Sequence, residues 1–181
     1  MIYVFLSDGF EEIEALAPVD ILRRGGCDVK TVGVGGKTAV GSHKIPVVCD
    51  ITAQEAVTDG LEGIILPGGM PGTLNLEKSG VVQRFIDFAT ENGLYIGAIC
   101  AAPSILGHKG LLRGKKATCF PGFEKELDGA EFLDIPVVTD GKTTTACGAG
   151  AAFDFGFRLL SELTGDKEGA DALKKSMKYN K

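Results

Sequence analysis

Short apolar runs alternate with amphipathic segments along the whole 181-residue chain. The run Ile-Tyr-Val-Phe-Leu at 2–6 is apolar throughout and ends at Ser-Asp-Gly, which is typical of a strand buried on both faces of a parallel sheet. Runs of the same kind occur at 63–66 and 95–99. Apolar side chains at helical spacing mark three other segments, residues 10–24, 81–90 and 149–163. The alternation predicts an α/β fold, with a mostly parallel sheet and helices on both of its faces.

Weaker patterns complete the predicted order of elements. Further strands are predicted at 27–34, 116–120, 137–139 and 143–146, a hairpin at 40–49 with its turn near 42–44, a short helix from 103 that closes at 107–110, and a last helix from about 166. Pro18 lies inside the first helix and cannot donate to the carbonyl of Glu14, so the helix is expected to bend there. No internal boundary is visible, and residues 1–181 are predicted to form a single domain.

Composition excludes several classes of partner. The formal net charge of −5 and the pI of about 5.1 argue against nucleic acid and against an anionic membrane surface, because both partners require a basic face. The five cysteines are odd in number, widely spaced and without a CxxC pair, which predicts neither a disulfide framework nor a metal site. We find no secretory leader and no membrane span, and expect a cytoplasmic protein.

The glycine-rich stretches do not form a nucleotide site. Residues 31–38 and 136–143 both end in Gly-Lys-Thr, but each lacks the first glycine of a phosphate-binding loop and neither precedes a helix. Residues 148–153 lack the third glycine of a dinucleotide fingerprint. We therefore expect no cofactor.

The strongest candidate for chemistry is Cys100, at the junction between a predicted strand and a predicted helix. Pro103 suits the first turn of that helix, and small residues on both sides of Cys100 permit a tight turn like a nucleophile elbow. A cysteine near a helix N-terminus is expected to have a lowered pKa. Free cysteine is also one of the most buried residue types, so on this motif alone packing is as good an explanation as catalysis.

A second loop qualifies as a partner for Cys100. Pro-Gly-Gly-Met-Pro-Gly at 67–72 follows a buried strand, at the end of the sheet where open α/β folds place their ligands. Gly69 could offer a bare backbone N–H to an oxyanion. A plain turn explains the loop equally well.

Four motifs together resemble one known family, the ThiJ/PfpI superfamily. They are Glu-Glu-Ile-Glu at 11–14 with Pro-Val-Asp at 18–20, Leu-Pro-Gly-Gly at 66–69, Ala-Ile-Cys-Ala-Ala-Pro at 98–103, and Gly-Ala-Gly at 148–150 with Phe-Asp-Phe-Gly at 153–156. The likeness covers essentially the whole chain, and the motif spacing is most similar to the branch of the parkinsonism-associated protein deglycase and its small bacterial homologues. It implies a flavodoxin-like three-layer sandwich and a homodimer.

The resemblance also implies roles for individual residues. Cys100 would be the nucleophile, hydrogen-bonded to a protonated Glu14, with the backbone N–H groups of Gly69 and Ala101 on the oxyanion side. The chemistry of the residues agrees, because a carboxyl buried beside a thiolate has a raised pKa and can donate a proton at neutral pH. Arg24 and Lys44 resemble basic positions near the dimer interface that could also meet substrate, although arginine is common at the second position.

Two departures narrow the chemistry that the resemblance implies. Ala101 stands where the protease branch carries a histidine, so a Cys-His peptidase is not expected. Phe120 stands where one branch has a histidine, which puts in doubt any mechanism that needs an imidazole base. The chain has only two histidines, His43 and His108, and neither matches a catalytic position.

Two functions remain open at this point. The first is a cofactor-free enzyme acting on reactive carbonyls or glycated substrates, as a glutathione-independent glyoxalase or a protein or nucleotide deglycase. The second is an oxidative-stress sensor or chaperone without turnover, in which Cys100 is oxidised to a sulfinic acid.

Overall fold

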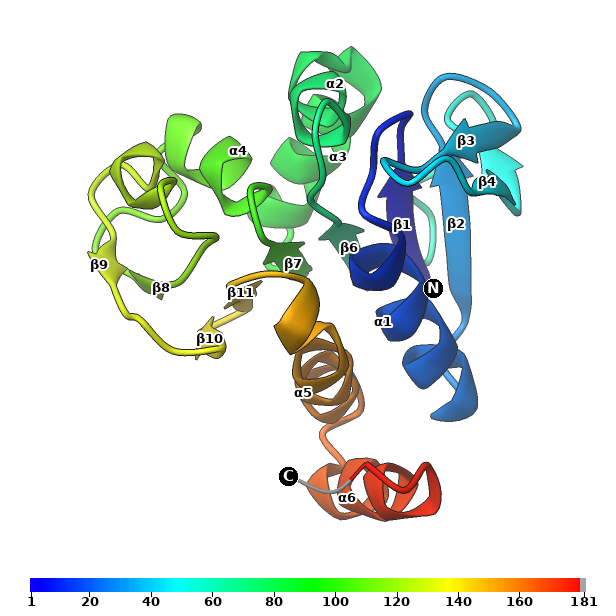
Figure 1. Ribbon diagram of the computed structural model, residues 1–181, viewed down its shortest axis with the longest axis vertical. Helices are drawn as coiled ribbons and strands as arrows, with labels where there is room; N and C mark the ends of the chain where they lie inside the picture. The colour runs from blue at the N-terminus through cyan, green and yellow to red at the C-terminus, as the bar shows by residue number, and fades with distance from the viewer. Residues whose placement is uncertain (180–181) are drawn as a thin grey trace.

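In a computed structural model that describes residues 1–179, a seven-stranded sheet forms the centre of the molecule (Figure 1). From one edge to the other its strands are β10 (Val137–Asp140), β11 (Thr143–Ala146), β7 (Tyr95–Ile99), β6 (Gly63–Leu66), β1 (Ile2–Leu6), β2 (Val29–Gly33) and β5 (Ile51–Thr52). All neighbouring pairs are parallel except β10 and β11. The mostly parallel sheet that the apolar runs predict is confirmed.

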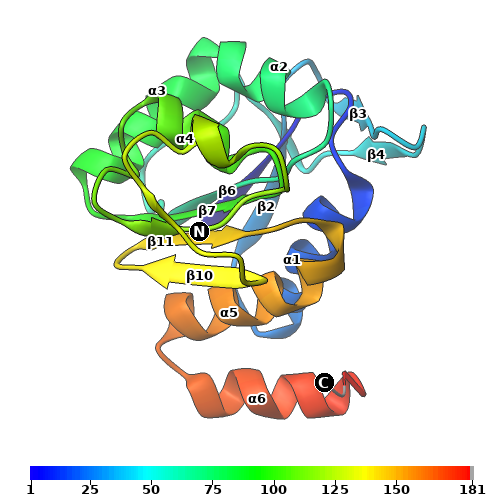
Figure 2. The same ribbon diagram turned by 60° about the vertical axis from the view of Figure 1, so that its left-hand side comes forward.

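Helices cover both faces of the sheet, as Figure 2 shows. On one face lie α1 (Glu12–Arg24) and α5 (Ala152–Thr164), with α6 (Lys167–Ser176) packed outside α5. On the other face lie α2 (Gly72–Lys78), α3 (Gly80–Glu91) and α4 (Pro103–His108). The molecule is therefore a three-layer α/β sandwich of the flavodoxin-like type, as the family resemblance implies.

The central strand β1 shows why its run is apolar throughout. Ile2, Val4 and Leu6 enter the core under α1 and α5, whereas Tyr3 and Phe5 enter the core under the opposite helices. Successive side chains of a strand point to opposite faces, so a strand covered on both faces has no polar position. No helix within residues 1–179 is long and apolar enough to cross a membrane.

Several predicted elements are corrected by the structure. The strand expected at 116–120 is only β8 (Lys116–Ala117), which pairs with β9 (Glu131–Phe132) outside the central sheet. The helix expected from 149 begins with a 3-10 turn, Ala149–Ala151, before α5. Helix α2 was not predicted, because it follows a loop rich in Gly and Pro and is only seven residues long. The predicted hairpin is present as β3 (Thr38–Val40) and β4 (Pro46–Val48).

The parallel register brings three loops together at one end of the sheet. Strand β6 lies between β1 and β7, and Leu66 is level with Ala98. The chain segments that follow these strands therefore emerge side by side. They carry the start of α1, the Pro-Gly-Gly loop and Cys100.

Candidate active site

Cys100 occupies a strained turn between β7 and α4. Its φ angle is 65°, a left-handed conformation that a non-glycine residue adopts only at a cost. The turn is held from two sides, since the Cys100 N–H donates to the Ala146 carbonyl at 2.8 Å and the Cys100 carbonyl accepts from the Phe120 N–H at 2.8 Å. This is the elbow geometry that the small residues around Cys100 predict.

Glu14 reaches Cys100 from the first turn of α1. Its side chain is 1% exposed, and its carboxyl is hydrogen-bonded to the Cys100 thiol. The Gly68 N–H also donates to Glu14 Oε2 at 3.0 Å. A buried carboxyl with one backbone donor and one thiol partner is fixed in position and has little access to water.

Gly68 makes the contact between Glu14 and Cys100 possible. A Cβ atom at this position would lie 2.6 Å from Glu14 Oε2 and 2.6 Å from the Cys100 Cβ. Any side chain there would push the two apart. The Pro-Gly-Gly motif is visible in the sequence, but the role of its first glycine is not, because that role depends on contacts with residues 54 and 32 positions away.

Burial sets the protonation of the pair. It raises the pKa of Glu14 from 4.5 to about 7, so this carboxyl exchanges its proton near neutral pH. Burial, together with the negative charge of Glu14, raises the pKa of the Cys100 thiol to about 12. The repulsion acts only while Glu14 is ionised, so the two groups titrate as a coupled pair, and loss of the thiol proton is favoured when Glu14 can take it.

The sequence predicts a lowered pKa for the Cys100 thiol. This prediction is wrong while Glu14 is ionised, because the pKa of the thiol is then raised. Helix α4 has only six residues, and its N-cap is Ala102, two positions beyond Cys100. A short helix has a weak dipole, and its effect does not offset the burial of the thiol beside a carboxylate.

The backbone N–H groups of Ala101 and Gly69 both donate to the Cys100 sulfur, and each lowers the thiol pKa. Ala101 follows Cys100 in the elbow, whereas Gly69 has a φ angle of 91° in the loop after β6. The two donors lie where negative charge would develop on the sulfur or on an oxygen attached to its addition product.

A cleft of about 400 Å³ opens beside Cys100. Met70, Phe120 and Phe123 give it an apolar wall, and Glu11, Glu14 and His43 give it a polar one. The cleft is large enough for a small carbonyl compound and is reached directly from solvent.

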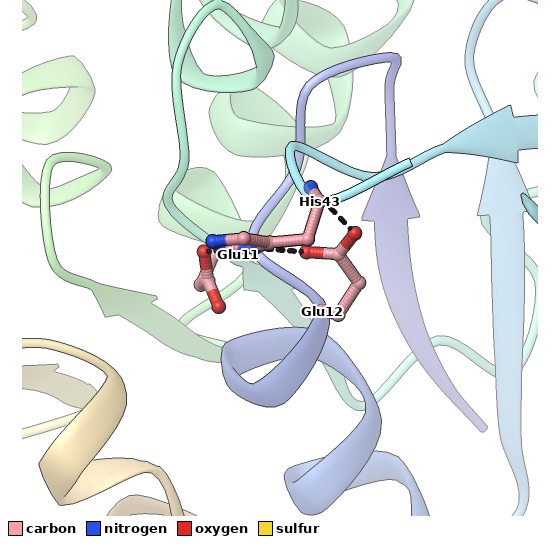
Figure 3. A group of neighbouring side chains, drawn as sticks. All are labelled: Glu11, Glu12 and His43. Atoms are coloured by element: carbon pink, nitrogen blue, oxygen red, sulfur yellow. Dashed lines mark hydrogen bonds and ion pairs between the residues drawn. The ribbon is translucent and has the colours of Figure 1, made fainter. Parts of the chain in front are cut away.

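His43 lines the cleft, although nothing in the sequence gives it a role there. It lies in the turn between β3 and β4, and no motif joins it to Cys100. Its Nδ1 atom lies 3.0 Å from Glu12 Oε2 and 3.4 Å from Glu11 Oε2 (Figure 3). In the sequence, Glu11 and Glu12 belong only to the Glu-Glu-Ile-Glu motif, because their contact with His43 depends on the hairpin folding back over α1.

Three further residues, Arg24, Lys44 and His108, do not line the Cys100 cleft. Arg24 is at the far end of α1, roughly 15 Å along the helix from Glu14, and pairs with Asp20 at 2.6 Å. Lys44 is exposed, with a φ angle of 68°, and borders a separate small pocket beside Met70. His108 bridges Glu77 and Glu126 on the surface near the end of α4.

A family model described as the DJ-1/PfpI family matches residues 1–162, which include every loop of the cleft. The chain belongs to the DJ-1/PfpI family. Within it, the chain is 34% identical over 173 residues to the Parkinson disease protein 7 homolog of Danio rerio, covering 92% of this chain and 91% of the relative. This likeness supports the DJ-1 branch that the four motifs indicate.

Two other relatives are similar to almost the whole of this chain. The Glutathione-independent glyoxalase DJR-1.2 of Caenorhabditis elegans is 30% identical over 166 residues, covering 91% of this chain and 88% of the relative. Protein DJ-1 homolog B of Arabidopsis thaliana is 32% identical over 178 residues, covering 97% of this chain, but the match spans only 41% of that longer protein.

A solved structure has the same fold. The crystal structure of a cysteine-to-alanine mutant of a DJ-1 superfamily protein from Salmonella typhimurium superposes with a TM-score of 0.94 at 34% identity. The superposition covers 99% of this chain and 98% of the other.

Proposed function

We propose that the protein is a cofactor-free enzyme that converts small reactive dicarbonyls such as methylglyoxal to hydroxy acids, using Cys100 and Glu14. The observation that carries the proposal is the buried carboxyl of Glu14, hydrogen-bonded to a thiol that faces an open cleft. The name of the Caenorhabditis elegans relative supports it.

The first step is addition of the thiol to the aldehyde. The Cys100 sulfur forms a bond to the aldehyde carbon, the C=O π bond breaks, and the thiol proton ends on the former carbonyl oxygen. The product is a hemithioacetal. The N–H groups of Gly69 and Ala101 are placed to stabilise the oxyanion before it takes up the proton.

Glu14 then moves a proton between adjacent carbons. As a carboxylate it removes the hydrogen from the carbon bonded to sulfur, giving an enediolate, and it returns that proton to the neighbouring carbon. The hydroxyl proton on the carbon bonded to sulfur passes to the neighbouring oxygen, so that the first oxygen becomes the thioester carbonyl and the second the alcohol. One carbon is oxidised to a thioester while the other is reduced to an alcohol, so no external electron carrier is required. Water then cleaves the carbon–sulfur bond and releases the hydroxy acid and the free thiol.

The decisive assay is lactate formation from methylglyoxal by the purified chain. We expect turnover in the wild type and its loss in Cys100→Ser and Glu14→Gln. His108→Asn is a matched control, because His108 lies at a surface cluster away from the cleft. Equal activity in wild type and Cys100→Ser would overturn the proposal.

A deglycase acting on early glycation adducts is the finer version of this proposal. The two activities are separable by measuring how fast an adduct of methylglyoxal disappears, with and without a chemical trap for the free dicarbonyl. An enzyme that removes the adduct itself would make the adduct disappear faster than the trap alone does. An enzyme that only consumes free dicarbonyl would make it disappear no faster than the trap does.

An oxidative-stress sensor is the second candidate. Two N–H donors and a protonated carboxyl surround the Cys100 sulfur, and these groups could hold the oxygens of a sulfinic acid. Intact mass after peroxide treatment tests it: we expect addition of two oxygens in wild type and none in Cys100→Ser. If this occurs without any turnover of methylglyoxal, the sensor replaces the enzyme.

We further propose that the protein is a cytoplasmic homodimer. The cytoplasm is supported by five free cysteines, three of them only partly buried. Exposed apolar side chains support the dimer: Ile13 and Leu16 on α1, and Ile45 and Val48 on the hairpin, are between 36% and 71% exposed. Arg24 and Lys44 are proposed to lie near this interface.

A further inference from the structure

We infer that Glu11, Glu12 and His43 form a binding site for a divalent transition-metal ion, of which Zn²⁺ is the best fit, at the edge of the Cys100 cleft. This inference goes beyond the proposed function. The sequence predicts no metal site, because His43 lies 31 residues from Glu12 and 32 from Glu11, and the three match no ligand motif.

The spacing of the three donor atoms fits coordination of one ion. One oxygen of each carboxylate and His43 Nδ1 lie within 4.8 Å of one another, with Nδ1 at 3.0 Å from Glu12 Oε2 and 3.4 Å from Glu11 Oε2. Ligands bound to zinc at about 2.1 Å lie roughly 3.0 Å apart at right angles and roughly 3.4 Å apart in a tetrahedron. Figure 3 shows the three side chains converging from the start of α1 and the hairpin turn.

The carboxylate of Glu12 is oriented before any ion arrives. Its Oε1 atom accepts hydrogen bonds from the His43 N–H at 2.8 Å and the Ile45 N–H at 3.4 Å, which leaves Oε2 facing Nδ1. Hydrogen bonds of this kind from neighbouring groups hold metal-binding carboxylates in place. Glu12 is only 6% exposed, so its carboxylate is held in this orientation by the surrounding backbone.

Charge also favours an ion at this position. Two carboxylates meet at one imidazole. The Ser42 hydroxyl lies 3.1 Å from Glu11 Oε2, 3.3 Å from Glu12 Oε2 and 3.1 Å from His43 Nδ1. A cation that binds Nδ1 must displace any proton there, and the two carboxylates then face a neutral imidazole with charges that a divalent ion would neutralise. Imidazole and carboxylate together are a typical donor set for zinc, and the exposed side of His43 leaves room for water at the remaining positions.

A second cluster, around His108, also joins one imidazole to two carboxylates but does not have the geometry of a metal site. His108 also contacts two glutamates, Glu77 through Nδ1 at 2.5 Å and Glu126 through Nε2 at 2.7 Å. The carboxylates lie on opposite sides of the ring, so no single ion can reach both of them and one ring nitrogen. His108→Asn is thus a matched control for substitution of His43.

The test is metal binding by the full chain, stripped with chelator and titrated with Zn²⁺ by calorimetry. We expect about one ion per chain in wild type and His108→Asn, and binding at least about tenfold weaker in His43→Ala and Glu11→Gln. The His43 side chain is 70% exposed and the Glu11 side chain 16% exposed, and thermal unfolding without metal checks that both variants are folded.

A Cys100→Ser variant separates this site from the catalytic thiol. We expect it to bind Zn²⁺ like the wild type, and we expect Co²⁺ bound to the wild type to lack a thiolate-to-metal charge-transfer band. Absence of binding, unchanged binding in His43→Ala, or loss of binding in Cys100→Ser would each overturn the inference. Because the readout is binding, its failure leaves the proposed carbonyl chemistry untouched.

Discussion

The Glu14 carboxyl and the Cys100 thiol share a hydrogen bond, although 86 residues separate them in the chain. Gly68 holds the carboxyl from the other side through its N–H at 3.0 Å. Burial raises the pKa of both groups, so the pair keeps at least one proton across the physiological range. The proposed chemistry depends on where that proton resides.

The pH dependence of turnover should report Glu14. The productive pair carries one proton, with the thiol protonated and Glu14 available as a base. Below the Glu14 pKa of about 7 both groups are protonated, so kcat/KM should rise with pH through an apparent pKa near 7. Glu14→Gln should lower kcat by about 10²–10⁴-fold and remove this limb of the profile. A wild-type profile flat between pH 5.5 and 8.5 would contradict the assignment.

Replacement of Glu14 should stabilise the protein while it removes activity. The folded-state pKa of about 7 lies above the unfolded value of 4.5, so the folded state binds the proton more tightly. Between these two pH values Glu14 is ionised in the unfolded chain and protonated in the folded protein, so the free energy of unfolding falls as pH rises. As pH rises from 4.5 to 7, we expect the free energy of unfolding of Glu14→Gln to increase by up to about 3 kcal/mol relative to that of the wild type. Denaturant titrations at several pH values measure the difference; parallel pH profiles of the two proteins would count against it.

Gly68→Ala should separate the pair. The added Cβ would lie 2.6 Å from both the Glu14 carboxylate and the Cys100 Cβ, so at least one of them must move. We expect a loss of stability of about 1–3 kcal/mol and a kcat close to that of Glu14→Gln. Gly150→Ala, which meets no atom within 4 Å, is the control in the same assays. Full activity in Gly68→Ala would show that the contact with Glu14 is not needed.

The proposed dimer should depend on the hairpin. Val48 is 71% exposed on β4, and an aspartate there would place a charge on the apolar face formed with α1. We expect Val48→Asp to sediment as a monomer and the wild type as a dimer. Val57→Asp alters a valine that is 57% exposed outside this face and should remain dimeric. A monomeric wild type would remove the proposal altogether.

The sequence by itself determined the fold class and singled out Cys100 as the strongest candidate for chemistry. Apolar runs at 2–6, 63–66 and 95–99 match β1, β6 and β7 residue for residue, because strands covered on both faces admit no polar position. Cys100 was identified from the small residues that a strand-to-helix turn requires. Glu14 was chosen by resemblance, and the structure brings it to the thiol.

Only the tertiary structure decided the electrostatics of the site. The pKa of Cys100 depends on the burial of the thiol and on a carboxylate from another helix, and neither follows from its place before a helix. His43 likewise gained its neighbours when the hairpin between β3 and β4 folded against the start of α1. Local pattern records the periodicity of burial, whereas contacts between distant segments depend on how the loops at the end of the sheet converge.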